Sequence, residues 1–382
     1  MFIEIHVLQN FAPSNLNRDD TGAPKDCTFG GYRRARISSQ CLKRAIRSHF
    51  AEAKLFAPAQ LATRTKRIVD EVAKRLEKKG RKPDEVQTAL GALLAGARIG
   101  LKEGKTEYLL YLGEDEIGKL AALCDKHWDE LTGAAPKASA KAEDGKKKTA
   151  KETKKEAKDS LSPELQKAVV DVLGSGKAVD LALFGRMLAD MPEKNVDAAC
   201  QVAHAISTNE VAMEMDFYTA VDDLRPGDTQ GADMMGMVEF NSSCFYRYAK
   251  VDLGMLAKNL QGDKKLTADA AVALVKSSVA AVPTGKQNSM AAHNPPFYVR
   301  VLVREGGEAW NLANAFIKPV RPGKGPDGDM AQLSVGALDG HLAALRRMYG
   351  GGGVVSDLTA SLYDDKSLSM PALVAELEKT LP

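Results

Sequence analysis

Residues 30–50 read GGYRRARISSQCLKRAIRSHF and carry six lysine or arginine residues and no acidic residue. The segment from Tyr32 to Ser38 alternates in the way that is typical of a β-strand with one buried face. Its inward face would hold Arg33, Ala35 and Ile37. Its opposite face would hold Tyr32, Arg34, Arg36 and Ser38. We therefore expect a strand with a basic outer face, entered through two glycines.

A helix is predicted directly after this strand. Ser38 and Ser39 are good N-terminal caps. The apolar side of the helix would hold Leu42, Ala45, Ile46, His49 and Phe50, and the other side Gln40, Lys43, Arg44 and Arg47. Because a helix start offers backbone N–H groups and the positive end of the helix dipole, this arrangement suits a phosphate. The row of cations predicts a row of phosphates.

The same charges also fit a solvated basic face that pairs with acids from elsewhere, because exposed ion pairs are common. The loop SNLNRDDTGAPKD, residues 14–26, favours the binding hypothesis. Its Asn17, Arg18 and Lys25 precede the basic cluster on a loop where side chains can reach a ligand. Its two acids, Asp19 and Asp20, would equally be able to hold those cations.

Composition sets broad limits. A chain of 382 residues can form two or three domains, or one domain with large insertions. Its net charge of +3 gives no general attraction for anions, so anion binding must come from local clusters. Five scattered cysteines form no C-x-x-C pair, as expected of reduced thiols in a cytoplasm. Without a signal peptide or a long apolar run, the chain is expected to be soluble and cytoplasmic, with no membrane contact.

The first half of the chain predicts a strand followed by helices. Phe2 to Leu8 alternates like a strand with one buried face, and residues 59–131 follow a helical period. Residues 134–160 consist largely of Ala, Lys, Thr and Glu without large apolar side chains. We interpret them as an exposed insertion. A lysine-rich tract can also bind nucleic acid, but this one contains acids and lacks a period.

The second half mixes helices and strands. Patterns predict strands at Met237–Tyr248 and Phe297–Arg304, and a polar, Met-containing loop at 209–236 of the kind that often carries function. The predicted helices are 161–173, 197–206, 252–260, 266–281, 307–316, 335–348 and 370–380. Strands at both ends with helices between them predict an α+β fold whose central sheet is interrupted by a helical subdomain.

Catalytic and metal-binding patterns are weak. The six histidines lie far apart, and no H-x-x-x-H or H-E-x-x-H occurs. PTGKQNS, residues 283–289, lacks the first glycine and the GK[ST] ending of a nucleotide-binding loop, and YGGGG, residues 349–353, does not match a dinucleotide fingerprint. The pair Asp222 and Asp223 is too little for a two-metal nuclease. We expect no catalytic site, no metal and no cofactor.

Eight short motifs, in order along nearly the whole chain, resemble the CasC family, the backbone subunit of the type I-E CRISPR surveillance complex Cascade. They are N-x-N-R-D-D at 15–20, F-G-G-x-R-R-x-R-I-S-S-Q-x-L-K-R-A at 29–45, L-x-G-R-M at 183–187, A-H-A-I-S-T at 203–208, D-F-Y-T-A-V-D-D-L at 216–224, F-Y-R-Y-A at 245–249, P-T-G-K-Q-N at 283–288 and A-A-H-N-P at 291–295. The match is weakest over residues 100–180.

The resemblance implies an RRM-like (ferredoxin-like) palm, an inserted helical fingers subdomain and a thumb hairpin. The palm would comprise 1–58 and 241–382, the fingers 59–200 with the insertion at 134–160, and the thumb 208–240. No RNP1-type stretch is present, so stacking of several bases on sheet aromatics is not expected. Recognition would then follow the RNA backbone and its shape, which suits a guide of any sequence.

The resemblance also implies a function and a set of RNA contacts. Such a subunit has no catalytic site; it polymerises head to tail along a guide RNA and presents the guide for pairing with target DNA. Its partners would be the guide RNA, the paired target strand, other copies of itself and other Cascade subunits. The RNA-binding set would be Arg18, Lys25, Arg34, Arg36, Ser38, Gln40, Lys43, Arg44, Arg47, Met187, Phe217, Tyr218, Lys286 and Gln287.

An alternative from another class is an endonuclease of the same RRM-like fold that processes guide RNA or takes part in interference. Such an enzyme would place a histidine or tyrosine beside a glycine-rich loop. His293, in AAHNPP, is the residue that would be tested first.

Overall fold

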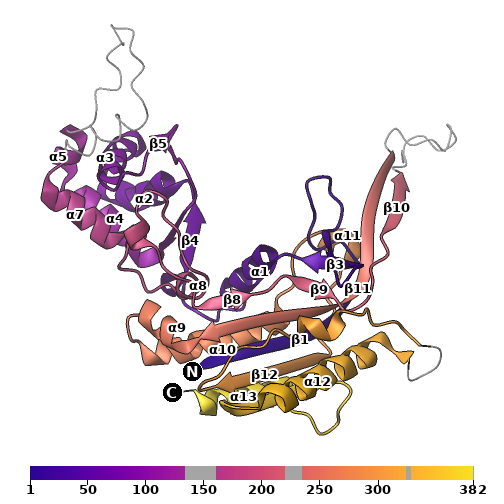
Figure 1. Cartoon of the computed structure of the whole chain (residues 1–382). Helices are drawn as coiled ribbons and strands as arrows, with labels where there is room; N and C mark the ends of the chain where they lie inside the picture. Colours follow the sequence, from indigo (N-terminus) through magenta and orange to yellow (C-terminus); the bar gives the residue numbers. More distant parts are fainter. Residues whose placement is uncertain (134–160, 220–234, 324–327, 382) are drawn as a thin grey trace, which may run out of the picture. The chain divides into compact units, whose positions relative to one another are not determined.

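A computed structural model describes residues 1–133, 161–219, 235–323 and 328–381 (Figure 1). The chain forms two compact units. The sheet unit comprises Met1–Ala53, Cys200–Gly254 and Thr267–Pro382, and the helical unit comprises Lys54–Ala199 and Met255–Leu266. The insertion predicted at 134–160 and the middle of the loop predicted at 209–236 lie outside the described residues.

The sheet unit is built on an antiparallel sheet in the order β13-β12-β1-β11-β9-β3-β2, with β8 and β10 also paired to β11. The α+β fold class expected from the sequence is confirmed. The strands are β1 (Phe2–Ser14), β2 (Asp26–Phe29), β3 (Tyr32–Ile37), β8 (Cys200–Val202), β9 (Ala205–Ser207), β10 (Glu214–Thr219), β11 (Met235–Asp252), β12 (Tyr298–Arg304) and β13 (Val354–Ser361).

The central strand β1 is buried on both faces, whereas its alternation predicted one solvated face. Glu4 and His6 are 0% exposed. Glu4 accepts a hydrogen bond from Arg304 Nε at 2.6 Å and from the Trp310 amide at 2.6 Å. The polar residues of β1 can be buried because neighbouring side chains and amides form hydrogen bonds with them. The alternation of apolar and polar residues does not distinguish such a buried face from a solvent-exposed one.

Helices cover both faces of the sheet (Figure 1). On one face, Leu8 of β1 belongs to an apolar cluster with Leu338 and Leu342 of α12 (Met330–Tyr349), which also includes residues of the 3₁₀ helix η4 (Leu312–Phe316). On the other face, Ile5 lines a small cavity with Leu42 of α1 (Ser39–Glu52). The remaining helices of the sheet unit are α11 (Gln287–Met290), α13 (Met370–Thr380) and most of α10 (Lys264–Ala280).

Most predicted elements are present, with several corrections. Residues 62–65, 101–102, 105–106 and 110–113, inside the block predicted as helical, form short strands, and residues 214–219, inside the predicted loop, form β10. Residues 197–206, predicted as a helix, form the short strands β8 and β9, because they pair with β11. Within the predicted helix 307–316, only η4 is helical, and it is a 3₁₀ helix. The edge strand β13 was not predicted; its exposed and half-buried residues give a weak alternation.

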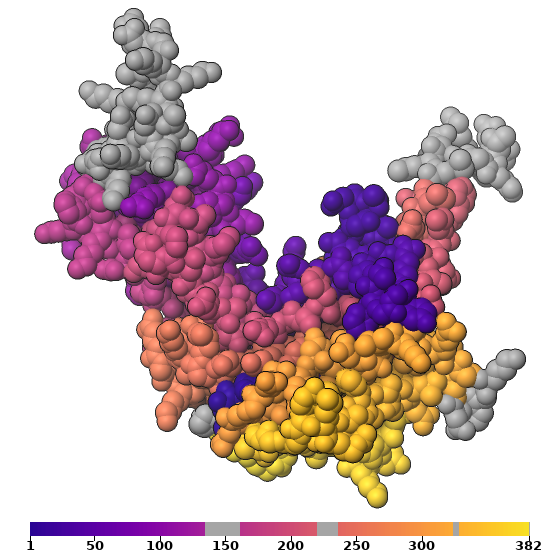
Figure 2. All heavy atoms as spheres, viewed as in Figure 1, coloured from indigo at the N-terminus to yellow at the C-terminus, as the bar shows by residue number. Residues whose placement is uncertain are grey.

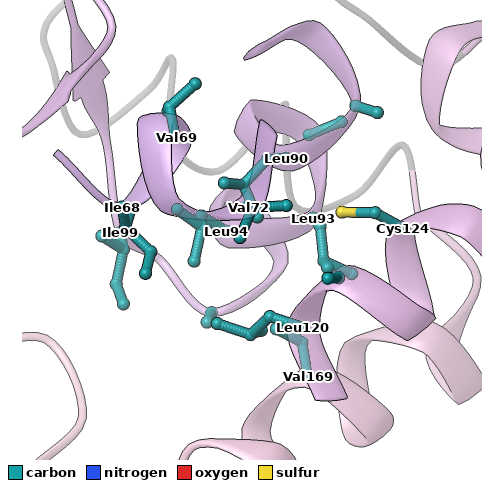
Figure 3. Close-up of a cluster of buried hydrophobic side chains, with 14 of the residues drawn as sticks. Ile68, Val69, Val72, Leu90, Leu93, Leu94, Ile99, Leu120, Cys124 and Val169 are labelled. Atoms are coloured by element: carbon teal, nitrogen blue, oxygen red, sulfur yellow. The ribbon is translucent and has the colours of Figure 1, made fainter. Parts of the chain in front are cut away.

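The helical unit packs most of its helices around a large apolar core (Figure 3), and Leu181 of α8 lies in a smaller cluster with Tyr111 and Ala178. Leu90 and Leu94 of α3 lie in this core together with Leu120 of α4 and Val169 of α7. Its helices are α2 (Ile68–Leu76), α3 (Pro83–Gly96), α4 (Glu114–Lys126), α5 (Trp128–Gly133), α7 (Pro163–Val172), α8 (Val179–Phe184) and the 3₁₀ turns η1 (Pro58–Gln60), η2 (Glu77–Lys79) and η3 (Pro192–Lys194), with part of α9 (Leu253–Asn259). Its two antiparallel strand pairs are β4 (Ala62–Thr65) with β7 (Leu110–Gly113), which are distant in the sequence, and the hairpin of β5 (Leu101–Lys102) with β6 (Lys105–Thr106). Within the described residues, no helix is long and apolar enough to cross a bilayer.

Candidate nucleic-acid interface

The start of α1 is capped as expected, but its amides are more fully paired than the sequence indicated. Ser38 Oγ accepts from the Cys41 amide at 3.3 Å, a cap that contributes about 1 kcal/mol. Asn17 Oδ1 accepts from the Ser38 amide at 2.7 Å, and His204 Nδ1 accepts from the Ser39 amide at 3.3 Å. Asn17 and Ser38 therefore build the helix start, and Ser38 is buried. The expected set of open amides is correspondingly smaller.

His204 is a member of this site that sequence reasoning missed, although it lies in the motif A-H-A-I-S-T. Its exposed ring is 3.3 Å from Arg36 Nη1 as well as from the Ser39 amide. Burial, followed by the nearby charges of Arg36 and Lys25, lowers the pKa of His204. In a neutral imidazole, Nδ1 has one lone pair, which the Arg36 guanidinium and the Ser39 amide share, so His204 links β3 to the start of α1.

The half-buried side chains of Lys25 and Arg36 lie beside this helix start. Both line a small cavity together with Asn17. Arg36 Nε donates to the carbonyl oxygen of Asp26 at 3.1 Å, which holds its guanidinium in one place along β3. The structure thus gathers Lys25, Arg36 and His204 at the N-terminal end of α1.

Arg34 does not belong to the exposed row. It is 0% exposed, and its guanidinium donates to backbone carbonyls inside the sheet unit. The outer face predicted for β3 is therefore wrong at this position: Arg34 is buried, whereas Arg33, predicted inward, is exposed and pairs with Asp26. The physical reason is that β3 is covered on this side by the segments that contribute the carbonyls.

The basic side of α1 is present as expected. Leu42, Ile46 and Phe50 are buried, which leaves the other side of the helix toward solvent. Gln40 and Arg44 are exposed, and Lys43 and Arg47 are half-buried.

An open groove of about 900 Å³ runs beside this helix. Arg18, Arg44 and Gln287 line it, so three residues from distant motifs meet there. Acidic side chains are present too. Asp19 accepts hydrogen bonds from Thr21 Oγ1 at 2.8 Å and from the amides of Thr21 and Ala23, which lowers its pKa. The Asp19 carboxylate thus stabilises the loop in which it lies.

The loop that carries Lys286 and Gln287 is packed against the loop before β2. A side chain at Gly285 would lie 2.3 Å from the Leu16 carbonyl oxygen, so only glycine fits at this position. Gln287 Nε2 donates to the Pro283 carbonyl at 2.9 Å. Lys286 is half-buried and has a φ of 52°, a conformation that is uncommon for residues other than glycine. PTGKQN therefore forms a tight turn on one wall of the groove.

The hairpin of β10 and β11 bears exposed apolar side chains. Met215, Phe217, Tyr218 and Met237 are 66%, 59%, 48% and 69% exposed. Phe217 faces Met237 across the ladder, and the ring of Tyr218 lies over Gly236. Figure 2 shows this hairpin standing out from the surface of the sheet unit. The tip of the expected thumb, residues 220–234, lies outside the described residues.

Met187 belongs to the helical unit and is 77% exposed. Its two neighbours are anchored. Arg186 is 5% exposed and donates from Nη1 to both oxygens of Glu116, at 2.9 and 3.0 Å. Leu188 is buried in the core of the helical unit. Gly185 has a φ of 78° and leaves no space for a side chain beside Val196. An apolar side chain is thus presented to solvent from a firmly held turn.

Three further histidines lie in different surroundings. Burial, followed by the charges of Arg300 and Arg304, lowers the pKa of His6 to about 3. His49 bonds to Ser277 Oγ at 2.8 Å. His293 is exposed and lines the groove. Within the described residues, no group of three or more His, Cys, Asp or Glu could hold a metal ion.

The fold and this surface define an antiparallel α+β protein with a basic helix beside an open groove. A model of the Cas_CT1975 family, CT1975-like proteins, matches residues 3–381, and the chain belongs to this family. No curated protein matches it. A chain from a solved "CRISPR RNA-guided surveillance complex, pre-nicking" is 32% identical, with a TM-score of 0.81 over 100% of both chains. A chain from another "CRISPR RNA-guided surveillance complex" is 28% identical, with a TM-score of 0.71 over 100% of both chains. The resemblance to a CRISPR-associated backbone subunit is thereby confirmed.

Proposed function

We propose that this protein is a non-catalytic subunit of a type I-E CRISPR surveillance complex. It binds the guide RNA along its backbone, polymerises head to tail along the guide and presents it for pairing with target DNA. In this proposal the sheet unit is the RRM-like palm, the helical unit corresponds to the fingers and the β10–β11 hairpin belongs to the thumb.

The main support is the surface of the sheet unit around α1. Lys25 and Arg36 lie at the helix start, and Arg44 projects from the helix into the groove that Arg18 and Gln287 also line. Cations in a row can contact successive phosphates without reading bases, which a subunit that carries any guide sequence requires. The likeness to chains of RNA-guided surveillance complexes supports the same conclusion.

Purification of the untagged protein from its native host tests the proposal. We expect RNA to copurify, so that the ratio of absorbance at 260 nm to that at 280 nm is high and falls after ribonuclease treatment. The recovered RNA should contain repeat-derived guide sequences. A protein that is free of RNA, and that fails to bind single-stranded RNA added at low salt, would refute the proposal.

The endonuclease alternative rests on one observation: His293 is exposed in the groove that carries Arg18 and Arg44. Incubation of the protein with a precursor guide RNA separates the two functions. The proposed subunit leaves this RNA intact with or without divalent cations. Cleavage that is abolished by His293→Ala, but not by His341→Ala, would establish the enzyme instead.

A further inference from the structure

Arg34 carries a buried charge that the RNA-binding proposal does not use. Its guanidinium makes no hydrogen bond to a carboxylate within the described residues. Instead, Nη1 donates to the carbonyl oxygens of Ser207 at 2.9 Å, Thr208 at 2.8 Å and Asn209 at 3.4 Å. Nη2 donates to those of Phe316 at 2.6 Å and Ile317 at 3.2 Å. Burial lowers the pKa of Arg34 and outweighs the charge of Glu210, which favours the cation from a distance. A buried guanidinium that is hydrogen-bonded to carbonyl oxygens and not to a carboxylate is costly, so its retention calls for an explanation.

The carbonyl oxygens belong to two segments that are distant in the sequence. One backbone hydrogen bond already joins them, from the Val320 amide to the Thr208 carbonyl at 2.9 Å, and Arg34 adds five further contacts beside it. Residues 207–209 leave β9 and lead toward β10, and residues 316–317 end η4. Arg34 is well suited to join them, because a planar guanidinium directs several N–H donors at once. A lysine in this place has a single nitrogen and would not span both groups.

The segment 207–209 is the root of the β10–β11 hairpin on its β10 side. On the other side, β11 continues directly into the sheet, so the hairpin is fixed there by the strand ladder. The β10 side joins the sheet through Ser207, which faces Phe245 of β11, and through the Thr208 amide, which donates to the Cys244 carbonyl at 2.7 Å. Beyond Thr208, it depends on local bonds. The Cys244 amide donates to Asn209 Oδ1 at 3.1 Å, Ser207 Oγ donates to the Asn209 carbonyl at 2.6 Å, and the Val211 amide donates to the Arg33 carbonyl at 3.0 Å.

We propose that Arg34 is a positioning residue: its guanidinium fixes the root of the hairpin to the end of η4, and so sets the direction in which the hairpin presents Phe217 and Tyr218. The inference rests on the proposed function, in which this hairpin contacts a neighbouring subunit and nucleic acid. It assigns a different role to a residue that lies within the basic stretch 30–50, because Arg34 acts on the hairpin and not on RNA.

Hydrogen exchange of the RNA-free protein tests the inference directly. In Arg34→Met and Arg34→Lys, amides of residues 208–219 should exchange about tenfold or more faster, while amides of β1 keep the parent's protection. Arg33→Lys, which changes the exposed neighbour, is the matched control and should leave both segments unchanged. Equal loss of protection in β1 and the hairpin would mean that Arg34 only stabilises the sheet unit, and would overturn the inference.

RNA binding distinguishes positioning from phosphate contact. For a short single-stranded RNA that occupies one subunit, Arg34→Met should keep the parent's affinity within a few-fold and the same salt dependence. Loss of a phosphate contact would instead reduce the log–log salt slope by about 0.7. Assembly on a full-length guide should weaken at least about tenfold, because the hairpin is no longer held in one direction.

Asn209→Ala is a second, independent variant that loosens the root of the hairpin without removing a charge. It takes away the bond to the Cys244 amide at the same root, so it should reproduce the faster hairpin exchange and the weaker assembly. If Arg34→Met fails to fold, Arg34→Lys and Asn209→Ala still decide the matter. Normal assembly by both folded variants refutes the positioning role. Failure of the parent itself to bind RNA would refute the proposed function, whereas the exchange result stands without RNA.

Discussion

The basic residues near α1 differ in what they do, although the sequence shows them as one cluster. Arg34 is buried, Arg33 pairs with Asp26, and Arg44 lies exposed in the groove. Strand alternation placed Arg34 outside because it takes no account of a covering segment. The next helix was predicted more accurately, because the spacing of Leu42 and Ile46 defines its buried side directly.

The charges of α1 should determine RNA affinity. Reversal of Lys43, Arg44 and Arg47 to Glu is expected to weaken RNA binding by at least about 100-fold, since the loss of three bonds of about 1 kcal/mol each corresponds to that factor. Circular dichroism should remain that of the parent, because the buried side of α1 is unchanged. The matched control reverses three exposed cations elsewhere, Arg347, Lys366 and Lys379, and should retain most of the affinity. Equal losses in both triple variants would contradict the assignment.

Buried His6 makes stability depend on pH. The folded protein keeps His6 neutral down to about pH 3, whereas the unfolded chain protonates it near pH 6.5. Stability from this group is therefore fully present above pH 6.5 and is lost as the pH falls, by about 1.4 kcal/mol per pH unit. Urea titrations between pH 7 and 4 should show this slope. His6→Gln should flatten it, whereas exposed His293→Gln should not; a slope unchanged in His6→Gln would mean that other groups cause it.

At the level of elements, segments with a strong period were predicted, and those without one, the short strands β8 and β9 and the weakly alternating β13, were not. β11 and α12 have strong periods, so their presence follows from the sequence. β8 and β9 have three residues each, and they are strands because β11 pairs with both of them and β3 pairs with β9. Such short segments carry no period, so tertiary pairing decides their conformation.

The β10–β11 hairpin should matter for assembly more than for folding. Phe217→Ala with Tyr218→Ala is expected to leave the melting temperature within about 2 °C, because about half of each side chain is exposed and neither lies in a core cluster. Assembly on a full-length guide should weaken more than binding of a short RNA to one subunit. Size-exclusion chromatography provides the measurement. Assemblies as large and as salt-resistant as those of the parent would contradict the role proposed for these aromatics.

The turn that presents Met187 should depend on the buried pair of Arg186 and Glu116. Glu116→Gln leaves a buried guanidinium without its counter-charge, so we expect a loss of about 3 to 5 kcal/mol of unfolding free energy. Lys119→Ala breaks an exposed pair with Asp115 and should cost no more than about 0.5 kcal/mol. Chemical denaturation compares the two. Similar small losses would show that the pair does not support this turn.

For the whole molecule, the order of the sequence motifs indicated the family, whereas composition alone did not. The α+β class follows from strands at both ends of the chain, and the family assignment confirms the resemblance that the motifs indicated. The groove was not predictable, because Arg18, Arg44 and Gln287 become neighbours only when three distant segments fold together. His204 was missed for the same reason: its role depends on the backbone of Ser39.

The amino-acid composition of residues 134–160 predicts that they contribute little to the stability and assembly of the protein. Deletion of residues 137–160 should leave the melting temperature and assembly nearly unchanged, since these residues lack the side chains that form a core. Differential scanning calorimetry and size-exclusion chromatography give both readouts. A large loss of either would show that this segment packs against the protein or a neighbour.

In the proposed function, the protein binds the phosphate backbone of the RNA and does not read its bases. The most direct measurement is the affinity for two single-stranded RNAs of unrelated sequence, titrated at several salt concentrations. With four to six phosphates contacted, we expect a log–log slope of roughly −3 to −4 for both RNAs and affinities within a few-fold of each other. A slope near zero, or a strong preference for one sequence, would contradict it.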